Sequence, residues 1–159
     1  MIERHATLHE KLYECRLHIQ RLQRARKHIK NYIPIESKSY NNLSDETMSF
    51  IDQMIYRFSK LQDTMGEKIF TTILELGGEP IKQMTFIDKL NRLEELELVD
   101  RAEWMMLRKE RNEIAHEYSF NTQEVVDSIN AIHNKARILI ETFETIERYA
   151  QLKYGDKLS

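Results

Sequence analysis

A chain of 159 residues is long enough to bury one continuous core and too short for two, so we expect residues 1–159 to form a single domain. Its 24 basic and 26 acidic residues nearly cancel, which excludes a strong net field for polyanions, and a nucleic-acid function must therefore rest on a local site. The single cysteine, Cys15, excludes an internal disulfide, and we find neither an apolar signal segment nor a membrane-spanning stretch, so we expect a core cysteine in a cytoplasmic protein.

The first predicted element is a long helix that ends near Tyr32 and Pro34. An apolar stripe recurs along it at alternating steps of four and three, as one buried face of a helix requires. The stripe consists of Leu8, Leu12, Cys15, Ile19, Leu22, Ala25 and Ile29. The opposite face is basic, and its charges either meet RNA phosphate or are simply solvated. The basic residues are Arg16, Arg21, Arg24, Arg26, Lys27 and Lys30.

Residues 36–42 are mostly polar and predict a loop before the longest helix. Ser44 is a typical N-cap for that helix, and Gly77-Gly78 followed by Pro80 predicts its end. Its stripe is Met48, Ile51, Ile55, Phe58, Leu61, Met65, Ile69, Ile73 and Leu76. Gly66 inside the helix predicts either a kink or close contact with a neighbouring helix.

Three further helices are predicted. Thr85 is expected to cap a short one, Asp100 with Glu103 is a capping-box pattern that opens the next, and Asn121 with Glu124 opens the last. The last stripe, which runs on to Gly155, is Val125, Ile129, Ile132, Ala136, Leu139, Phe143, Ile146 and Ala150. No segment alternates with period two, as a strand would. We therefore predict an all-α, up-and-down bundle of about four to five helices.

The segment with the clearest chemical pattern is Arg111-Asn112-Glu113-Ile114-Ala115-His116-Glu117-Tyr118, near the end of the fourth predicted helix. Four residues separate its arginine from its histidine. That spacing alone carries little information, because Arg4 and His9 repeat it. The copy at Arg111 adds an asparagine directly after the arginine and a tyrosine two residues after the histidine.

This Arg-x4-His-x-Tyr pattern resembles the signature of the HEPN superfamily, and within it that of the HepT-like toxins paired with minimal nucleotidyltransferases. The run from residue 50 to residue 130, including IYRFSKLQDTMG, LGGEP and MTFIDKLNRLEEL, is also similar to this group, so about half of the chain is covered specifically. The resemblance implies a HEPN-like homodimer or higher homo-oligomer. It also implies a ribonuclease that needs neither metal nor cofactor, whose site forms where two protomers bring their motifs together.

The residues of the motif suggest a division of roles. Arg111 would hold the scissile phosphate with its planar fork of donors, and Asn112 would orient the imidazole or a phosphate oxygen. His116, with an ordinary pKa of about 6.5, would take a proton from an RNA 2′-hydroxyl or give one to the leaving oxygen. On a straight helix Arg111 and His116 point roughly 140° apart, so either the helix ends between them or a second copy supplies the partner group.

A plainer interpretation remains for the same residues. Arg111 could form a surface ion pair with Glu110 or Glu113, while His116 only stabilises the carboxyl end of its helix.

Two other features stay open. Arg108, one turn before Arg111, either extends a phosphate-binding strip or pairs with Glu103 or Glu110. The pair His5 and His9 has a spacing that metal ligands use on a helix, but we expect it to be a surface coincidence and predict no metal site.

Tyr118 has its own two interpretations. The resemblance implies that it is the acceptor onto which a nucleotidyltransferase antitoxin transfers AMP, and the alternative is a tyrosine that packs at the helix end. We therefore expect a ribonuclease toxin that cleaves RNA, with transfer RNA as one candidate, and that its cognate nucleotidyltransferase silences. The alternatives are a non-catalytic substrate-binding subunit of a nucleotidyltransferase and a structural helical dimer with a vestigial motif.

Overall fold

The computed structural model describes residues 2–114 and 121–158, and these residues form helices and no strands, as predicted. The long helices are α1 (Ile2–Ile29), α3 (Asp45–Thr64), α6 (Arg101–Ile114) and α7 (Thr122–Leu158). The shorter ones are α2 (Ser37–Tyr40), α4 (Phe70–Leu76) and α5 (Phe86–Glu95). Two 3-10 turns, η1 (Lys30–Tyr32) and η3 (Ile81–Gln83), and the π-helical segment η2 (Met65–Ile69) complete the described chain.

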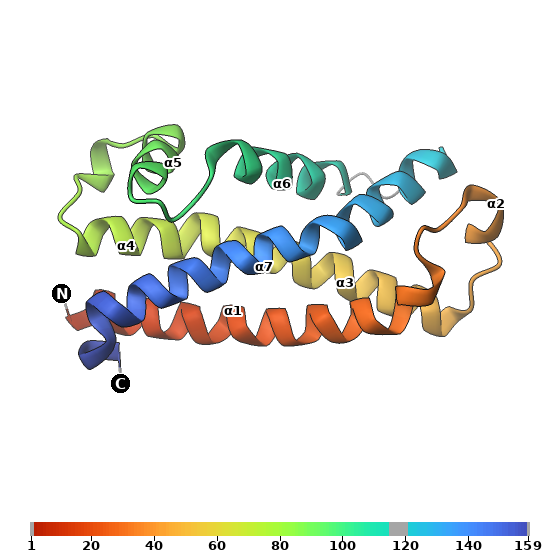
Figure 1. Ribbon diagram of the computed structural model, residues 1–159, viewed down its shortest axis with the longest axis horizontal. Helices are drawn as coiled ribbons and strands as arrows, with labels where there is room; N and C mark the ends of the chain where they lie inside the picture. Colours follow the sequence, from red (N-terminus) through yellow and green to blue (C-terminus); the bar gives the residue numbers. More distant parts are fainter. Residues whose placement is uncertain (1, 115–120, 159) are drawn as a thin grey trace.

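Successive long helices run in opposite directions, which makes the molecule an up-and-down helical bundle (Figure 1). Helix α1 lies beside the continuous rod formed by α3, η2 and α4, and α5 and α6 pack on the other side of that rod. Helix α7 crosses the bundle diagonally and contacts α1, α3 and α6. The two chain ends lie together at one end of the bundle (Figure 1).

The predicted stripes supply most of the core, because each packs against the stripes of neighbouring helices. In α1 the stripe is buried except for Ile19, which is partly buried, and the α7 stripe is buried except for Val125. Cys15 is fully buried, as predicted, and this burial raises the pKa of its thiol to about 12. The largest fully buried side chains are Trp104, Phe58, Phe70 and Phe143.

The predicted caps at Ser44 and Thr85 are confirmed by hydrogen bonds. The Ser44 side chain accepts from the backbone N–H of Thr47, and Thr85 forms a complete capping box with Asp88. Helix α4 ends at Leu76, and Gly78 follows with a φ of +84°, which a residue without Cβ adopts at no steric cost.

Two predicted boundaries were wrong. Residues 36–42 contain the single turn α2 because the Glu36 carbonyl accepts from the N–H groups of Ser39 and Tyr40, and this turn packs against α7. Helix α7 does not end at Gly155 but continues to Leu158. An interior glycine weakens a helix by only about 1 kcal/mol, which is too little to end one.

Of the two interpretations of Gly66, the close contact with a neighbouring helix is confirmed. It lies inside η2, where the α-helical hydrogen-bond pattern is interrupted, and a Cβ added to it would lie 3.2 Å from Cζ2 of Trp104 in α6. The missing side chain therefore lets α6 approach the α3–η2–α4 rod closely. None of the helices described combines the length and the apolar character needed to cross a lipid bilayer.

Candidate functional site

Helix α6 is held tightly along one face, and this fixes the direction of its exposed side chains. The oxygen Oδ1 of Asp100 accepts from the N–H of Glu103 at 2.9 Å at the amino end. Trp104, Leu107 and Ile114 are buried in the bundle. Glu110 is also buried, and its carboxylate accepts from Nζ of Lys135 on α7 at 2.6 Å. Arg108, Asn112 and Glu113 are exposed near the carboxyl end of α6, and Arg111, at the edge of the buried face, is partly exposed.

Arg111 reaches from α6 to Asp63 on α3. Its Nε lies 3.3 Å from Asp63 Oδ1 and its Nη2 lies 3.1 Å from Asp63 Oδ2, so the carboxylate grips one side of the guanidinium with two hydrogen bonds. The side chains remain 29% and 38% exposed. The predicted ion-pair partners of Arg111 were wrong, since Glu110 pairs with Lys135 and Glu113 with Lys109. Glu110 and Glu113 project from other sides of α6, whereas the Arg111 side chain faces α3.

Two hollows flank the pair formed by Arg111 and Asp63, and both of these residues line each hollow. The first, with a volume of about 580 Å³, is called the α5–α6 hollow. Its other walls include Gly66, Phe86, Lys89, Trp104, Arg108 and Asn112. The second, of about 430 Å³, is called the α3 hollow and is also lined by Asp52, Ile55, Tyr56, Ser59, Lys60 and Ile114. The guanidinium thus lies on a ridge between two depressions.

Arg108 and Asn112, predicted to belong to the site, lie beside Arg111 in the α5–α6 hollow. The Arg108 guanidinium lies over the ring of Phe86, 4.8 Å from its centroid, and both partners predicted for it, Glu103 and Glu110, were wrong. Within the described chain, Arg108 forms no ion pair with a carboxylate. The structure therefore brings together three of the predicted residues, and the Arg108 guanidinium among them pairs with no carboxylate of the described residues.

His116 and Tyr118 lie outside the described residues, and so does the junction between α6 and α7. Sequence analysis missed Asp63, although a signal was present. Asp63 lies three residues before Gly66, the position expected to meet a neighbouring helix, so a carboxylate there belongs to the same contact region.

Arg4 and His9, which are spaced like Arg111 and His116, lie on helix α1. Arg4 pairs with Glu75 of α4, while His9 is exposed. His5 is buried and packs edge-on against Tyr154, with ring centroids 5.5 Å apart, so the expectation of a surface position was wrong for this residue.

The basic face of α1 is only partly free. Arg16 forms an ion pair with Glu147, and Nε of Arg26 donates to the His133 carbonyl of α7 at 3.1 Å. Arg21, Arg24, Lys27 and Lys30 are exposed.

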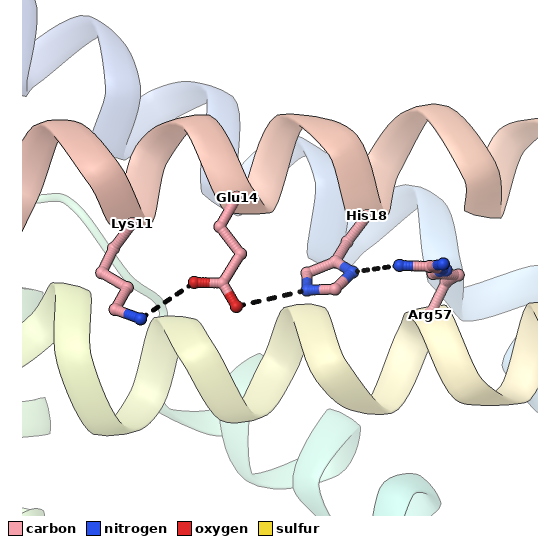
Figure 2. Close-up of polar contacts among 4 residues, drawn as sticks. All are labelled: Lys11, Glu14, His18 and Arg57. Atoms are coloured by element: carbon pink, nitrogen blue, oxygen red, sulfur yellow. Dashed lines mark hydrogen bonds and ion pairs between the residues drawn. The ribbon is translucent and has the colours of Figure 1, made fainter.

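A second polar cluster lies between α1 and α3 (Figure 2). Nη1 of Arg57 donates to Nδ1 of His18 at 3.0 Å, Nε2 of His18 lies 3.8 Å from Glu14, and Nζ of Lys11 donates to Glu14 at 3.0 Å. His18 is only 7% exposed, and its burial, together with the charge of Arg57, lowers the pKa of its imidazole. A guanidinium can only donate, so Nδ1 accepts and the imidazole is neutral. This chain of contacts links α1 to α3, and its Arg57 lies over the ring of Tyr56, which lines the α3 hollow.

In the described ranges, no three His, Cys, Asp or Glu side chains are grouped as a metal ion would require. Comparisons with protein families, with curated proteins and with solved structures found no match to this chain.

Proposed function

We propose that this protein is a metal-independent endoribonuclease whose site is the outward end of α6, with Arg111, Asn112 and His116 as its catalytic residues. The observation that supports this most strongly is the two-point grip of Asp63 on Arg111 between the two hollows. An arginine that is held in place and still open to solvent suits the binding of a phosphate that arrives from outside.

The hydrogen bonds between Asp63 and Arg111 leave part of the guanidinium available to a phosphate. A guanidinium has five N–H donors, and Asp63 occupies one on Nε and one on Nη2, which leaves three. Arg111 makes no other hydrogen bond to a described residue. The remaining donors lie along the far edge of the same rigid plane. A phosphate that approaches this edge can therefore be bound without breaking the ion pair, and the carboxylate keeps the plane in one orientation.

In the proposed reaction, the RNA 2′-oxygen attacks the adjacent phosphorus while the bond from phosphorus to the 5′-oxygen breaks. The 2′-hydroxyl loses its proton to a base and the 5′-oxygen gains one, and His116 performs one of these transfers. Arg111 stabilises the charge that develops on the non-bridging oxygens. Asn112 orients the imidazole or a phosphate oxygen. The products are a 2′,3′-cyclic phosphate and a 5′-hydroxyl, so 3′-hydroxyl ends alone would exclude the mechanism.

The proposal includes a homodimer or higher homo-oligomer, because Arg111 and His116 would point apart on a straight helix and a second protomer could supply the partner group. It also includes a cognate nucleotidyltransferase that acts as antitoxin. Transfer of AMP to Tyr118, two residues from His116, would place a bulky anion beside the phosphate site and repel the substrate.

The test compares purified wild-type protein with His116→Ala and Arg111→Ala on a transfer-RNA pool without divalent metal. The chain offers two matched controls, since His9→Ala and Arg21→Ala remove an exposed histidine and an exposed arginine of α1. We expect both site variants to lose cleavage and both controls to retain it. Equal cleavage by all five proteins would indicate a contaminating nuclease and overturn the proposal.

The second candidate function is that of a substrate-binding subunit of a nucleotidyltransferase. The same two hollows and the partly exposed Arg111 support it, but it requires no cleavage of RNA. Absence of cleavage by pure wild-type protein, combined with tight binding to a nucleotidyltransferase encoded beside it, would favour this candidate. A Tyr118→Phe protein that still gains the mass of AMP would exclude Tyr118 as the acceptor in either case.

A further inference from the structure

We infer that the α5–α6 hollow is a subsite for one base of single-stranded RNA, stacked on Arg108 next to the phosphate held by Arg111. The inference rests on the proposed function, because it assumes that the phosphate at Arg111 belongs to RNA. It adds where the neighbouring nucleotide lies and which side chains hold it.

The shape of the hollow suits one nucleotide. Its volume of about 580 Å³ lies within the ordinary range of small-molecule sites. Gly66 and Trp104 line its inner part, and Trp104 is only 2% exposed. The capping box at Thr85 holds the first turn of α5, which carries Phe86. Firm elements therefore form this wall, so a ligand would meet a largely preformed cavity.

Arg108 provides the stacking surface. Its guanidinium carbon lies over the Phe86 ring, 4.8 Å from the centroid, and this cation–π contact holds the cation beside the ring. Arg108 is exposed and forms no ion pair with a carboxylate of the described chain. Unstacked RNA bases commonly bind on arginine planes and on aromatic rings, and here both occur in one stack.

The hollow is lined by three cations and two acids, so its net charge favours an anionic ligand. Lys89 donates to the Thr71 hydroxyl at 3.1 Å rather than to a carboxylate, so it and Arg108 contribute two positive charges that no ion pair offsets. Asp63 is engaged by Arg111, and Glu67 is the other acid of this lining. The Asn112 amide at the rim has both a donor and an acceptor, which the edge of a base can use.

RNA differs from other polyanions because its bases are planar and can stack on Arg108. An acidic peptide or an inorganic polyphosphate would use the charges of Arg108 and Lys89 but not the supported plane. The base subsite therefore predicts that a change at Phe86, which carries no charge, weakens RNA binding and leaves polyphosphate binding unchanged.

Two signals report on the hollow. The anisotropy of a labelled, short single-stranded RNA with 2′-fluoro sugars measures binding without cleavage, because the nucleophile is absent. The chain has a single tryptophan, so the emission of Trp104 reports on the wall of the hollow itself. The variants are Phe86→Leu, Arg108→Gln and Lys89→Gln. Lys109→Gln is the matched control, since Lys109 is exposed on α6 and pairs with Glu113.

We expect Phe86→Leu to weaken RNA binding by about tenfold and to leave inorganic polyphosphate binding unchanged. Arg108→Gln and Lys89→Gln should weaken binding of both probes and lower the salt dependence of RNA binding by roughly one ion each. Wild-type Trp104 emission should change on RNA binding, and Lys109→Gln should behave as wild type. Thermal unfolding of each variant confirms that it is folded.

Two results would overturn the inference. One is RNA binding that Phe86→Leu and Arg108→Gln leave unchanged while both are folded, and the other is equal loss of RNA and polyphosphate binding in Phe86→Leu. Failure of the function gives a different pattern. If the hollow binds RNA as described but unmodified RNA is not cut, the ribonuclease proposal fails alone; if RNA is cut and the hollow variants bind normally, the subsite fails alone.

Discussion

Two arginines of this protein hold neighbouring helices together in contrasting surroundings. Arg57 of α3, itself partly exposed, donates to a neutral, buried His18 of α1 between the two helices (Figure 2). Arg111 of α6 is gripped by Asp63 of α3 at the surface, with a hollow on either side. The same side chain therefore serves packing in one place and is available to a ligand in the other, because the surroundings decide which of its donors remain free.

The sharpest test of this contrast replaces Arg111 by lysine, which keeps the charge and removes the planar fork. A lysine cannot be held at two points by Asp63 and also present an edge of donors to phosphate. We expect RNA cleavage to fall by about a hundredfold, the usual cost of losing a donor to developing charge. Single-turnover rates measure this, with thermal unfolding as the check on folding. Unchanged cleavage would contradict the catalytic role of the fork.

The matching change in the other region is His18→Leu. It removes the hydrogen bond that His18 accepts from the charged, partly exposed Arg57, so we expect the free energy of unfolding to fall by about 2 kcal/mol. Cleavage per folded molecule should not change, because neither His18 nor Arg57 lines the α3 hollow or the α5–α6 hollow. Urea unfolding measures the first quantity. His9→Leu, which changes an exposed histidine of α1, is the control and should leave stability nearly unaltered.

Asp63→Asn tests the grip on Arg111 with a smaller change. The amide can still accept one hydrogen bond, but it no longer offers two equivalent oxygens to the guanidinium, so the orientation of Arg111 loosens. We expect about a tenfold loss of cleavage, as is typical when a supporting partner is removed. Asp63→Glu keeps the two oxygens and should recover part of it. A purely structural role would instead lower stability and leave the rate per folded molecule unchanged.

The smallest effect concerns pH. The pKa values of His18 and His133 are lowered in the folded protein, mainly by burial. The unfolded chain then binds more protons than the folded one as pH falls below about 6.5, so the free energy of unfolding decreases there, by less than about 1.4 kcal/mol per pH unit for each histidine. His18→Gln should show a shallower decrease than wild type between pH 7.5 and 5.5 in urea unfolding. An equal slope would contradict the role of His18.

Local patterns predicted much of the fold because helix formation depends on near neighbours. The stripes of α1 and α7, the caps at Ser44 and Thr85, and the stop at Gly77-Gly78 follow from periodicity and from the hydrogen-bonding capacity of single side chains. The same signals failed for α2 and at Gly155. There the outcome depended on packing against α7 and on a helix already stabilised along its length.

For the candidate site, too, local sequence predicted one part and packing between helices decided the rest. The residue pattern at Arg111 and Asn112 predicted a site near the end of α6, since a motif is a property of order along the chain. The partner of Arg111 was not foreseen, because Asp63 lies 48 positions away along the chain and becomes its neighbour only when α6 packs on α3 at Gly66. The hollows, the support of Arg108 by Phe86 and the burial of Glu110 against Lys135 likewise arise between helices. Helical periodicity sets which way a side chain points on its own helix, but packing in three dimensions decides what it meets.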